Sequence, residues 1–280
     1  MLYSMKELLI HARDNGYGIV AASMQSEGNM KAAIRAAEEL NSPIILNHRY
    51  DRFDDDFEFY GDLARQRAYR TSVPVAINQD HGGTYEQAIR AIHAGYTGIM
   101  VDRSHLPYDE NVAQVAELTR IAHAAGVSVE SELGTMPWGY ESNDTAKAGM
   151  TDPGQVADFI KKTGIDCLAV CIGNKHGEYK GDPHIDFDVL AACKEAANGV
   201  PLVLHGGSGT GDENLSKACK MGVCKINVGT ALRYAGKAAY EQISDNKNHL
   251  DWWRAWDKGY QDAIMHHMQV FGSVGKAWTK

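Results

Sequence analysis

The stretch PLVLHGGSGTGDENLSKACKMGVCKINVGT (201–230) contains one complete strand–helix–strand unit. Two apolar runs, 201–207 and 223–230, flank an amphipathic segment over 212–222 that ends at Gly222. Near-continuous apolar runs are typical of strands that are buried on both faces of a parallel sheet. Two such strands joined by a helix form the repeating unit of an α/β fold.

The same unit recurs along the chain. Six further apolar runs predict strands at 18–24, 43–48, 74–80, 97–104, 126–134 and 165–173. Helical patterns among them cover 29–41, 84–95, 110–126, 152–164 and 187–199. Eight such units in 280 residues most simply close into a (β/α)8 (TIM) barrel, which we predict as a single α/β domain over 1–280. A doubly wound open sheet is the alternative, although no GxGxxG motif follows the first strand.

Helices are also predicted at both ends of the chain. The first 16 residues carry charges within an apolar pattern, which indicates an amphipathic helix and not a signal peptide. Residues 249–280 hold four of the five tryptophans, and their aromatic residues recur at helical spacing. We expect this C-terminal helical extension to pack against the barrel or against a second subunit.

Composition restricts the possible partners. The net charge of −8 argues against a nucleic-acid surface, which would be basic. Apolar runs of the roughly 20 residues that a transmembrane helix needs are missing from the sequence, so no membrane contact is expected. Five cysteines without CxxC spacing indicate reduced thiols in a cytoplasmic protein.

Three histidines follow predicted strands, and each is followed by glycine. They are His81 in VPVAINQDHGG (73–83), His176 in LAVCIGNKHGEYKG (168–181) and His205. A single histidine is more often structural than a ligand, but three in the same context are hard to assign to chance. Because functional groups of a barrel gather at the carboxyl ends of its strands, the three imidazoles predict a catalytic zinc site with an open fourth position.

Carboxylates lie near the same strand ends. Asp80 precedes His81 and is the candidate acid–base group, with a turn-forming role as the alternative. Asp102 follows the fourth strand, and Glu130 and Glu132 lie in the fifth. The barrel would bring all of them to one end.

Glycines at the ends of the seventh and eighth strands suggest phosphate binding. LHGGSG contains Gly206, Gly207 and Ser208, and KINVGT contains Gly229 and Thr230. Exposed backbone N–H groups ahead of helices bind phosphate, and barrel enzymes often use these two loops for it. Taken alone, GGSG is usually a flexible turn.

A long segment, ELGTMPWGYESNDTAKAGMTDP (132–153), separates the fifth strand from its helix. Loops of this length inside a compact domain are usually functional, which predicts a lid over about 134–151. Glu141 and Asp144 are its candidate acids. A solvated surface insertion is the alternative.

Taken together, the motifs resemble class II, zinc-dependent fructose-bisphosphate and tagatose-bisphosphate aldolases. The resemblance covers about residues 4–235, in order and at suitable spacing. The motifs that carry it are DHG (80–82), DRSHLPYDENV (102–112), VESELG (129–134), the segment 151–181, LVLHGGSG (202–209) and KINVGT (225–230).

The resemblance implies a lyase that reversibly cleaves a ketose 1-phosphate or 1,6-bisphosphate to dihydroxyacetone phosphate and an aldehyde, as in glycolysis. It implies one zinc ion per chain on the three histidines and a proton-transfer role for Asp80. Asp102 and Glu132 stand where the family keeps further metal-associated carboxylates. A monovalent cation accompanies the phosphate in the family. By the resemblance, the ketose phosphate is surrounded by Gly177, Lys180, Gly206, Ser208, Asn227 and Thr230.

Several positions depart from the family. Arg49 in LNHRYDR (46–52) stands where a serine is usual, so we predict that it reads an acidic group at the far end of the substrate. Pairing of Arg49 with Asp51 or Asp54 is the alternative. Gly229 replaces an Asp or Asn, and the altered lid motif makes Glu141 the candidate for the second proton transfer.

Two functions other than an aldolase are compatible with parts of the sequence. A metal-dependent sugar-phosphate isomerase or epimerase on the same barrel also needs a metal and a carboxylate base, but the phosphate motifs with three His–Gly turns favour the aldolase. A catalytically silent binding barrel would not need the complete set of metal and proton-transfer residues. We expect a phosphorylated sugar as the small-molecule partner and a homodimer or homotetramer as the assembly.

Overall fold

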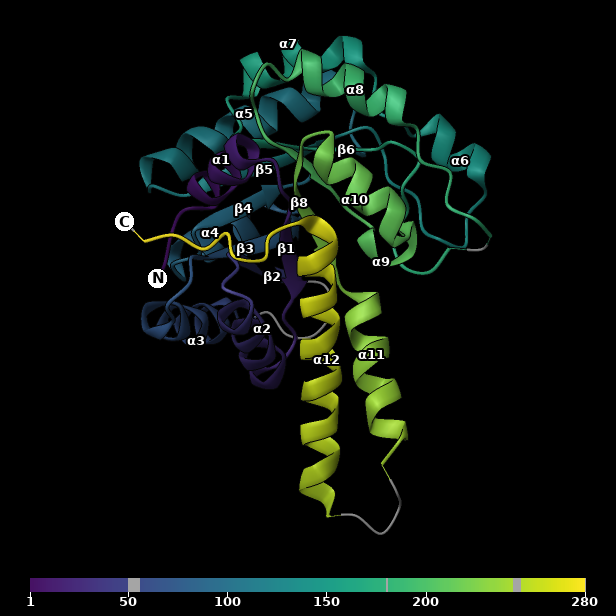
Figure 1. The fold of residues 1–280 in the computed structure, drawn as a ribbon. Helices are drawn as coiled ribbons and strands as arrows, with labels where there is room; N and C mark the ends of the chain where they lie inside the picture. The colour runs from purple at the N-terminus through teal and green to yellow at the C-terminus, as the bar shows by residue number, and fades with distance from the viewer. Residues whose placement is uncertain (50–55, 180, 244–247, 280) are drawn as a thin grey trace.

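The computed structural model describes residues 1–49, 56–179, 181–243 and 248–279. Eight parallel strands pair in chain order, and β8 pairs with β1 to close a barrel (Figure 1). The predicted (β/α)8 fold is therefore confirmed. The strands are β1 (Ile19–Ser23), β2 (Ile44–Arg49), β3 (Val75–Gly82), β4 (Gly98–Val101), β5 (Ser128–Leu133), β6 (Cys167–Val170), β7 (Leu202–Leu204) and β8 (Val223–Val228).

Helices surround the barrel and connect its strands. The described helices are α1 (Met5–Asn15), α2 (Glu27–Glu39), α3 (Phe57–Arg70), α4 (Tyr85–His93), α5 (Tyr108–Ala124), α6 (Asn143–Ala148), α7 (Pro153–Thr163), α8 (Phe187–Ala196), α9 (Gly207–Thr210), α10 (Asp212–Lys220), α11 (Thr230–Glu241) and α12 (His249–Phe271). No helix in these described ranges is both long and apolar enough to cross a membrane.

The predicted N-terminal helix closes one end of the barrel. Ser4 and Glu7 form a reciprocal capping box at the start of α1, and Gly16 ends the helix in the left-handed conformation. The apolar face of α1, which includes Leu8 and Leu9, packs with inward-facing strand residues such as Ile45. This plug leaves the carboxyl ends of the strands as the end where polar side chains gather.

The C-terminal extension completes the helical layer. α12 packs against α2, β1 and α10, so it fills the gap in the ring of helices beside the first strand. Its buried side chains there include Tyr260, Ile264 and Phe271, which confirms the expected packing against the barrel. The distal halves of α11 and α12 run side by side and project away from the barrel (Figure 1). Trp253 on this projection is 71% exposed.

Strand boundaries are where the sequence predictions differ from the structure. β7 ends at Leu204 and β6 at Val170, earlier than predicted, whereas β3 continues through His81 to Gly82. Apolar runs continue past the last ladder hydrogen bond because the strand ends remain buried beneath the loops. The sequence patterns do not indicate α3, α6, α9 and α11. Of these, α6 and α9 are too short to show a helical period, with 6 and 4 residues.

Candidate metal centre and active site

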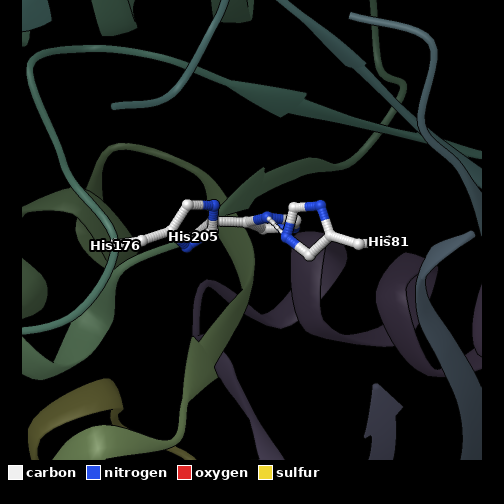
Figure 2. Close-up of side chains that lie close together, drawn as sticks. All are labelled: His81, His176 and His205. Atoms are coloured by element: carbon white, nitrogen blue, oxygen red, sulfur yellow. Dashed lines mark hydrogen bonds between the residues drawn. The ribbon is translucent and has the colours of Figure 1, made fainter. Parts of the chain in front are cut away.

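The three predicted ligand histidines come together at the carboxyl ends of β3, β6 and β7. Their ligand atoms all lie within 4.8 Å of one another. The ring centroids of His81 and His205 are 4.7 Å apart, and that of His176 lies 5.0 Å from His81. Figure 2 shows the imidazoles converging from different parts of the barrel.

Local backbone geometry directs these rings inward. His81 has a φ of 48°, a left-handed conformation that is uncommon for a non-glycine residue, and the β3–β4 register shifts between Gln79 and Gly82. The sharp turn therefore occurs at the histidine itself, one residue before Gly82. Gly206 has a φ of 69°, and a Cβ there would lie 2.0 Å from the carbonyl oxygen of Lys175. Only glycine fits at position 206, because the loop that carries His176 lies directly against its backbone.

Two of the histidines are each hydrogen-bonded to a carboxylate through one ring nitrogen. The Nδ1 atom of His81 is 2.8 Å from Asp102 Oδ2, and the Nε2 atom of His205 is 2.7 Å from Glu130 Oε1. An ionised carboxylate can only accept a hydrogen bond, so each of these imidazole nitrogens is the donor and carries the hydrogen. The opposite nitrogens, Nε2 of His81 and Nδ1 of His205, then face one another at 3.1 Å.

This arrangement fits a metal ion. Two neutral imidazoles in these tautomers would repel each other, so either a proton or a metal ion must lie between the two nitrogens. Zinc–nitrogen bonds of about 2.0–2.1 Å in a tetrahedral site place two ligand atoms about 3.4 Å apart, close to the separation seen here. Glu132 Oε2 is buried without a hydrogen-bond partner, 3.7 Å from His205 Nδ1. His81, Asp102 and Glu132 form a second group of possible ligands, in line with the predicted further carboxylates.

The titration properties of the cluster reflect crowding of charges in a buried space. Burial opposes protonation of His81, but Asp80 and Asp102 raise its pKa to about 8. Burial and the neighbouring histidines hold the pKa of His176 well below its usual value. Burial, together with the charge of Asp102, raises the pKa of Glu132 to about 8. A divalent cation would relieve the repulsion among these acids and favour neutral, ligating imidazoles.

Asp80 faces the same space from the end of β3. Its Oδ1 atom accepts a hydrogen bond of 2.9 Å from Asn227 Nδ2. Burial would raise the pKa of Asp80, but the nearby positive charges of His81, Lys225 and Arg49 outweigh burial and hold the pKa well below its usual range. Asp80 is therefore an ionised carboxylate, the form that a general base requires.

A cavity at the barrel mouth contains most of the predicted phosphate residues. Ser208 Oγ accepts hydrogen bonds from the backbone N–H groups of Gly229 and Ala231, at 3.3 and 3.1 Å. Gly207 lies behind the wall, where a Cβ would meet Ile226 at 2.6 Å. Lys180 lies outside the described residues. The predicted residues that line the cavity are Arg49, Asp80, His176, Gly177, Gly206, Ser208, Asn227, Gly229 and Thr230.

Other lining residues were not predicted from the sequence. They include Ser23, Gln25, Trp138 and Arg233. The guanidinium carbon of Arg49 is 5.8 Å from the ring centroid of Trp138. Spacing could have found Arg233, because it lies one helical turn after Thr230 and its Nη2 donates to the Thr230 hydroxyl at 3.1 Å. Asp51 and Asp54, the alternative partners considered for Arg49, lie outside the described residues.

The segment predicted as a lid forms a closed loop beside the cavity. The N–H of Thr135 donates to the carbonyl oxygen of Gly149 at its neck, and the loop contains α6, which the sequence patterns did not indicate. The Glu141 carboxylate accepts a hydrogen bond of 2.7 Å from the backbone N–H of Trp138. Asp144 is exposed in the first turn of α6. Neither acid lines the cavity in this conformation.

Comparisons with known proteins show the family to which the chain belongs. The sequence model of the family described as "Fructose-bisphosphate aldolase class-II" matches residues 3–276. The chain is 37% identical to the fructose-bisphosphate aldolase of Geobacillus stearothermophilus and 35% identical to the probable fructose-bisphosphate aldolase of Bacillus subtilis, with 99% of each chain covered. The crystal structure of the YdjI aldolase from Escherichia coli K12 superposes with a TM-score of 0.88 at 32% identity, covering 99% of this chain and all of that one. The chain belongs to the class II fructose-bisphosphate aldolase family, and it is an aldolase, a lyase built on a TIM barrel.

Proposed function

We propose that His81, His176 and His205 hold one zinc ion per chain. The observation that carries this proposal is the pair of imidazole nitrogens that face each other at 3.1 Å while their opposite nitrogens are committed to carboxylates. When bound, such an ion supplies an electrophile that polarises a carbonyl oxygen.

The substrate is proposed to be a ketose 1-phosphate or 1,6-bisphosphate, cleaved reversibly to dihydroxyacetone phosphate and an aldehyde. Asp80 removes the proton from the C4 hydroxyl as the C3–C4 bond breaks, a role that its ionised carboxylate and its place in the cavity support. The 1-phosphate lies against Gly177, Gly206, Ser208 and Thr230, and Asn227 orients Asp80. A monovalent cation accompanies this phosphate, as the family resemblance predicts.

Metal removal tests the zinc proposal. Dialysis against a chelator should abolish release of dihydroxyacetone phosphate from fructose 1,6-bisphosphate and related ketose phosphates, and one equivalent of Zn²⁺ or Co²⁺ per chain should restore it. A coupled assay for triose phosphate measures the activity, and elemental analysis measures the metal. Full activity in a metal-free preparation would overturn the proposal. Ketose conversion without triose phosphate would indicate an isomerase.

We also propose that the chain, as one domain over 1–280, assembles into a homodimer or homotetramer. Support comes from the tip of the α11–α12 projection, where an apolar hollow is lined by Tyr240, Trp252, Trp253 and Trp256. Exposed apolar patches of this kind mark interaction surfaces. The five buried, free cysteines support a cytoplasmic location for the enzyme. Light scattering of the wild type and of Trp253→Glu tests the assembly, which the charge should weaken.

A further inference from the structure

Lys225 lies on β8, inside the barrel and beneath the metal centre. Its side chain has no exposed area. Taking an ammonium group out of water is costly unless ionic and hydrogen-bonding partners compensate. The partners of Lys225 therefore indicate what the residue is for.

One partner leads to a metal ligand. Lys225 Nζ forms an ion pair of 2.7 Å with Glu130 Oε2, and the other carboxylate oxygen of Glu130 lies 2.7 Å from His205 Nε2. Because one oxygen of Glu130 is held by the ammonium group, the other is directed at the imidazole. The carboxylate then keeps the His205 hydrogen on Nε2 and leaves Nδ1 for the metal.

The second partner leads to the acid–base group. Lys225 Nζ also donates a hydrogen bond of 2.7 Å to Asn227 Oδ1. The amide oxygen of Asn227 is thereby occupied, so its NH₂ group must turn the other way, where Nδ2 donates to Asp80 Oδ1 at 2.9 Å. The ammonium group thus decides which end of the amide meets Asp80.

We propose that Lys225 is a positioning residue that orients His205 through Glu130 and Asp80 through Asn227, so that one buried ammonium group aligns the metal site with the acid–base group. The inference rests on the proposed zinc site. It differs from a purely structural ion pair because it requires effects on both zinc affinity and turnover in correctly folded protein.

The experiment measures zinc affinity by competition with a chromophoric chelator in the wild type, Lys225→Met, Glu130→Gln and Asn227→Ala. Lys225→Met should bind zinc about 10–100-fold more weakly, the usual effect of removing a group that supports a metal ligand. At saturating zinc its kcat should also fall by about tenfold or more, since Asp80 is no longer aligned. Its Co²⁺-loaded form should show altered visible absorption bands.

The two branches provide matched controls. Glu130→Gln should bind zinc more weakly, as Lys225→Met does. The double variant Lys225→Met/Glu130→Gln should lose no more zinc affinity than either single variant, because both changes act through one chain of contacts. Asn227→Ala should lose turnover and keep wild-type zinc affinity. The double variant removes both charges of the buried pair, so it also provides the zinc-affinity measurement if Lys225→Met alone does not fold.

The measurements distinguish failure of the proposed role of Lys225 from failure of the proposed zinc site. Wild-type zinc affinity in folded Lys225→Met or in the double variant, or fully additive losses in Lys225→Met and Glu130→Gln, would overturn the role of Lys225 while leaving the zinc site intact. A wild-type protein that binds no zinc would instead overturn the proposed function. Circular dichroism and thermal unfolding of the metal-free variants establish that folded proteins are being compared.

Discussion

At the scale of single residues, hydrogen bonds from neighbouring side chains fix the orientation of His81, His205 and Asp80 in the candidate site. Asp102 and Glu130 direct His81 and His205, and Asn227 directs Asp80. Such support commonly contributes as much to a metal or acid–base site as the reacting groups themselves. Substitutions here should therefore change metal binding and turnover in distinguishable ways.

Asp80→Ala separates proton transfer from metal binding. The variant should keep zinc and its fold but lose at least about 10²-fold in kcat, because it lacks the acid–base group. Measurement of kcat at saturating zinc, together with bound metal by elemental analysis, checks this. Loss of zinc with an unchanged rate per bound metal would instead make Asp80 a structural neighbour of His81.

Arg49→Ala tests whether this cavity-lining guanidinium reads an acidic group at the far end of the substrate. On the best bisphosphate, kcat/KM should fall by roughly 10–100-fold, the loss of one charge-assisted contact. On the matching ketose 1-phosphate it should barely change. Arg49→Lys should give an intermediate loss, since it keeps the charge and lacks the planar fork. Equal losses on both substrates would assign Arg49 to the structure of the site.

At the scale of elements, the segment after β5 is held in place by hydrogen bonds from neighbouring residues. Lys175 Nζ donates to the carbonyl oxygen of Glu141 and to Asn143 Oδ1, at 2.9 and 2.7 Å. The N–H of Gly139 donates to the carbonyl oxygen of His176 at 2.7 Å, which connects the loop to one of the proposed metal ligands. We propose that this loop, over about 134–151, is a lid that rearranges when substrate binds.

The lid proposal places Glu141 at the second proton transfer. For this role Glu141 must release its hydrogen bond to the N–H of Trp138. Glu141→Gln should slow hydrogen exchange at the nucleophilic carbon of bound dihydroxyacetone phosphate while leaving zinc in place, with Asp144→Asn as the matched control. Deuterium uptake followed by NMR measures the rate. Unchanged exchange in Glu141→Gln would move the role to another acid, and slowed exchange in the control alone would identify Asp144.

At the scale of the whole molecule, the two ends of the barrel differ in polarity. α1 closes one end with apolar side chains, and the other end carries the charged centre. Stability also depends on the layer between strands and helices, where His48 lies buried among aromatic rings. Its Nδ1 atom is 2.5 Å from the hydroxyl oxygen of Tyr96.

His48 makes the stability of the protein depend on pH. Burial lowers its pKa to about 4, whereas the unfolded chain has a value near 6.5, so the unfolded state binds the extra proton between these values. Stability from this residue is present above about pH 6.5 and falls as pH drops towards 4, by at most about 3 kcal/mol. Urea unfolding of metal-free wild type and His48→Gln across this range should show the steeper decline in the wild type. Parallel curves would contradict the assignment.

Strand–helix alternation, the barrel and the clustering of His81, His176 and His205 could be predicted from the sequence, because buried parallel strands have a local apolar signature and their carboxyl ends meet at one end of the barrel. Local signals also placed Ser208, Gly229 and Thr230 at the mouth. The left-handed turn at His81, the projection formed with α11 and the participation of Trp138 and Arg233 emerged only from the structure.

The same division holds at the metal centre. The strand–His–Gly pattern can be recognised in the sequence because it involves only neighbouring residues, and it predicts the three histidines as ligands. The pairing of His205 with Glu130, and of Glu130 with Lys225, joins β5, β8 and the loop after β7, residues that are far apart in sequence. Only closure of the barrel brings them together, because the inward direction of each side chain depends on the register between neighbouring strands.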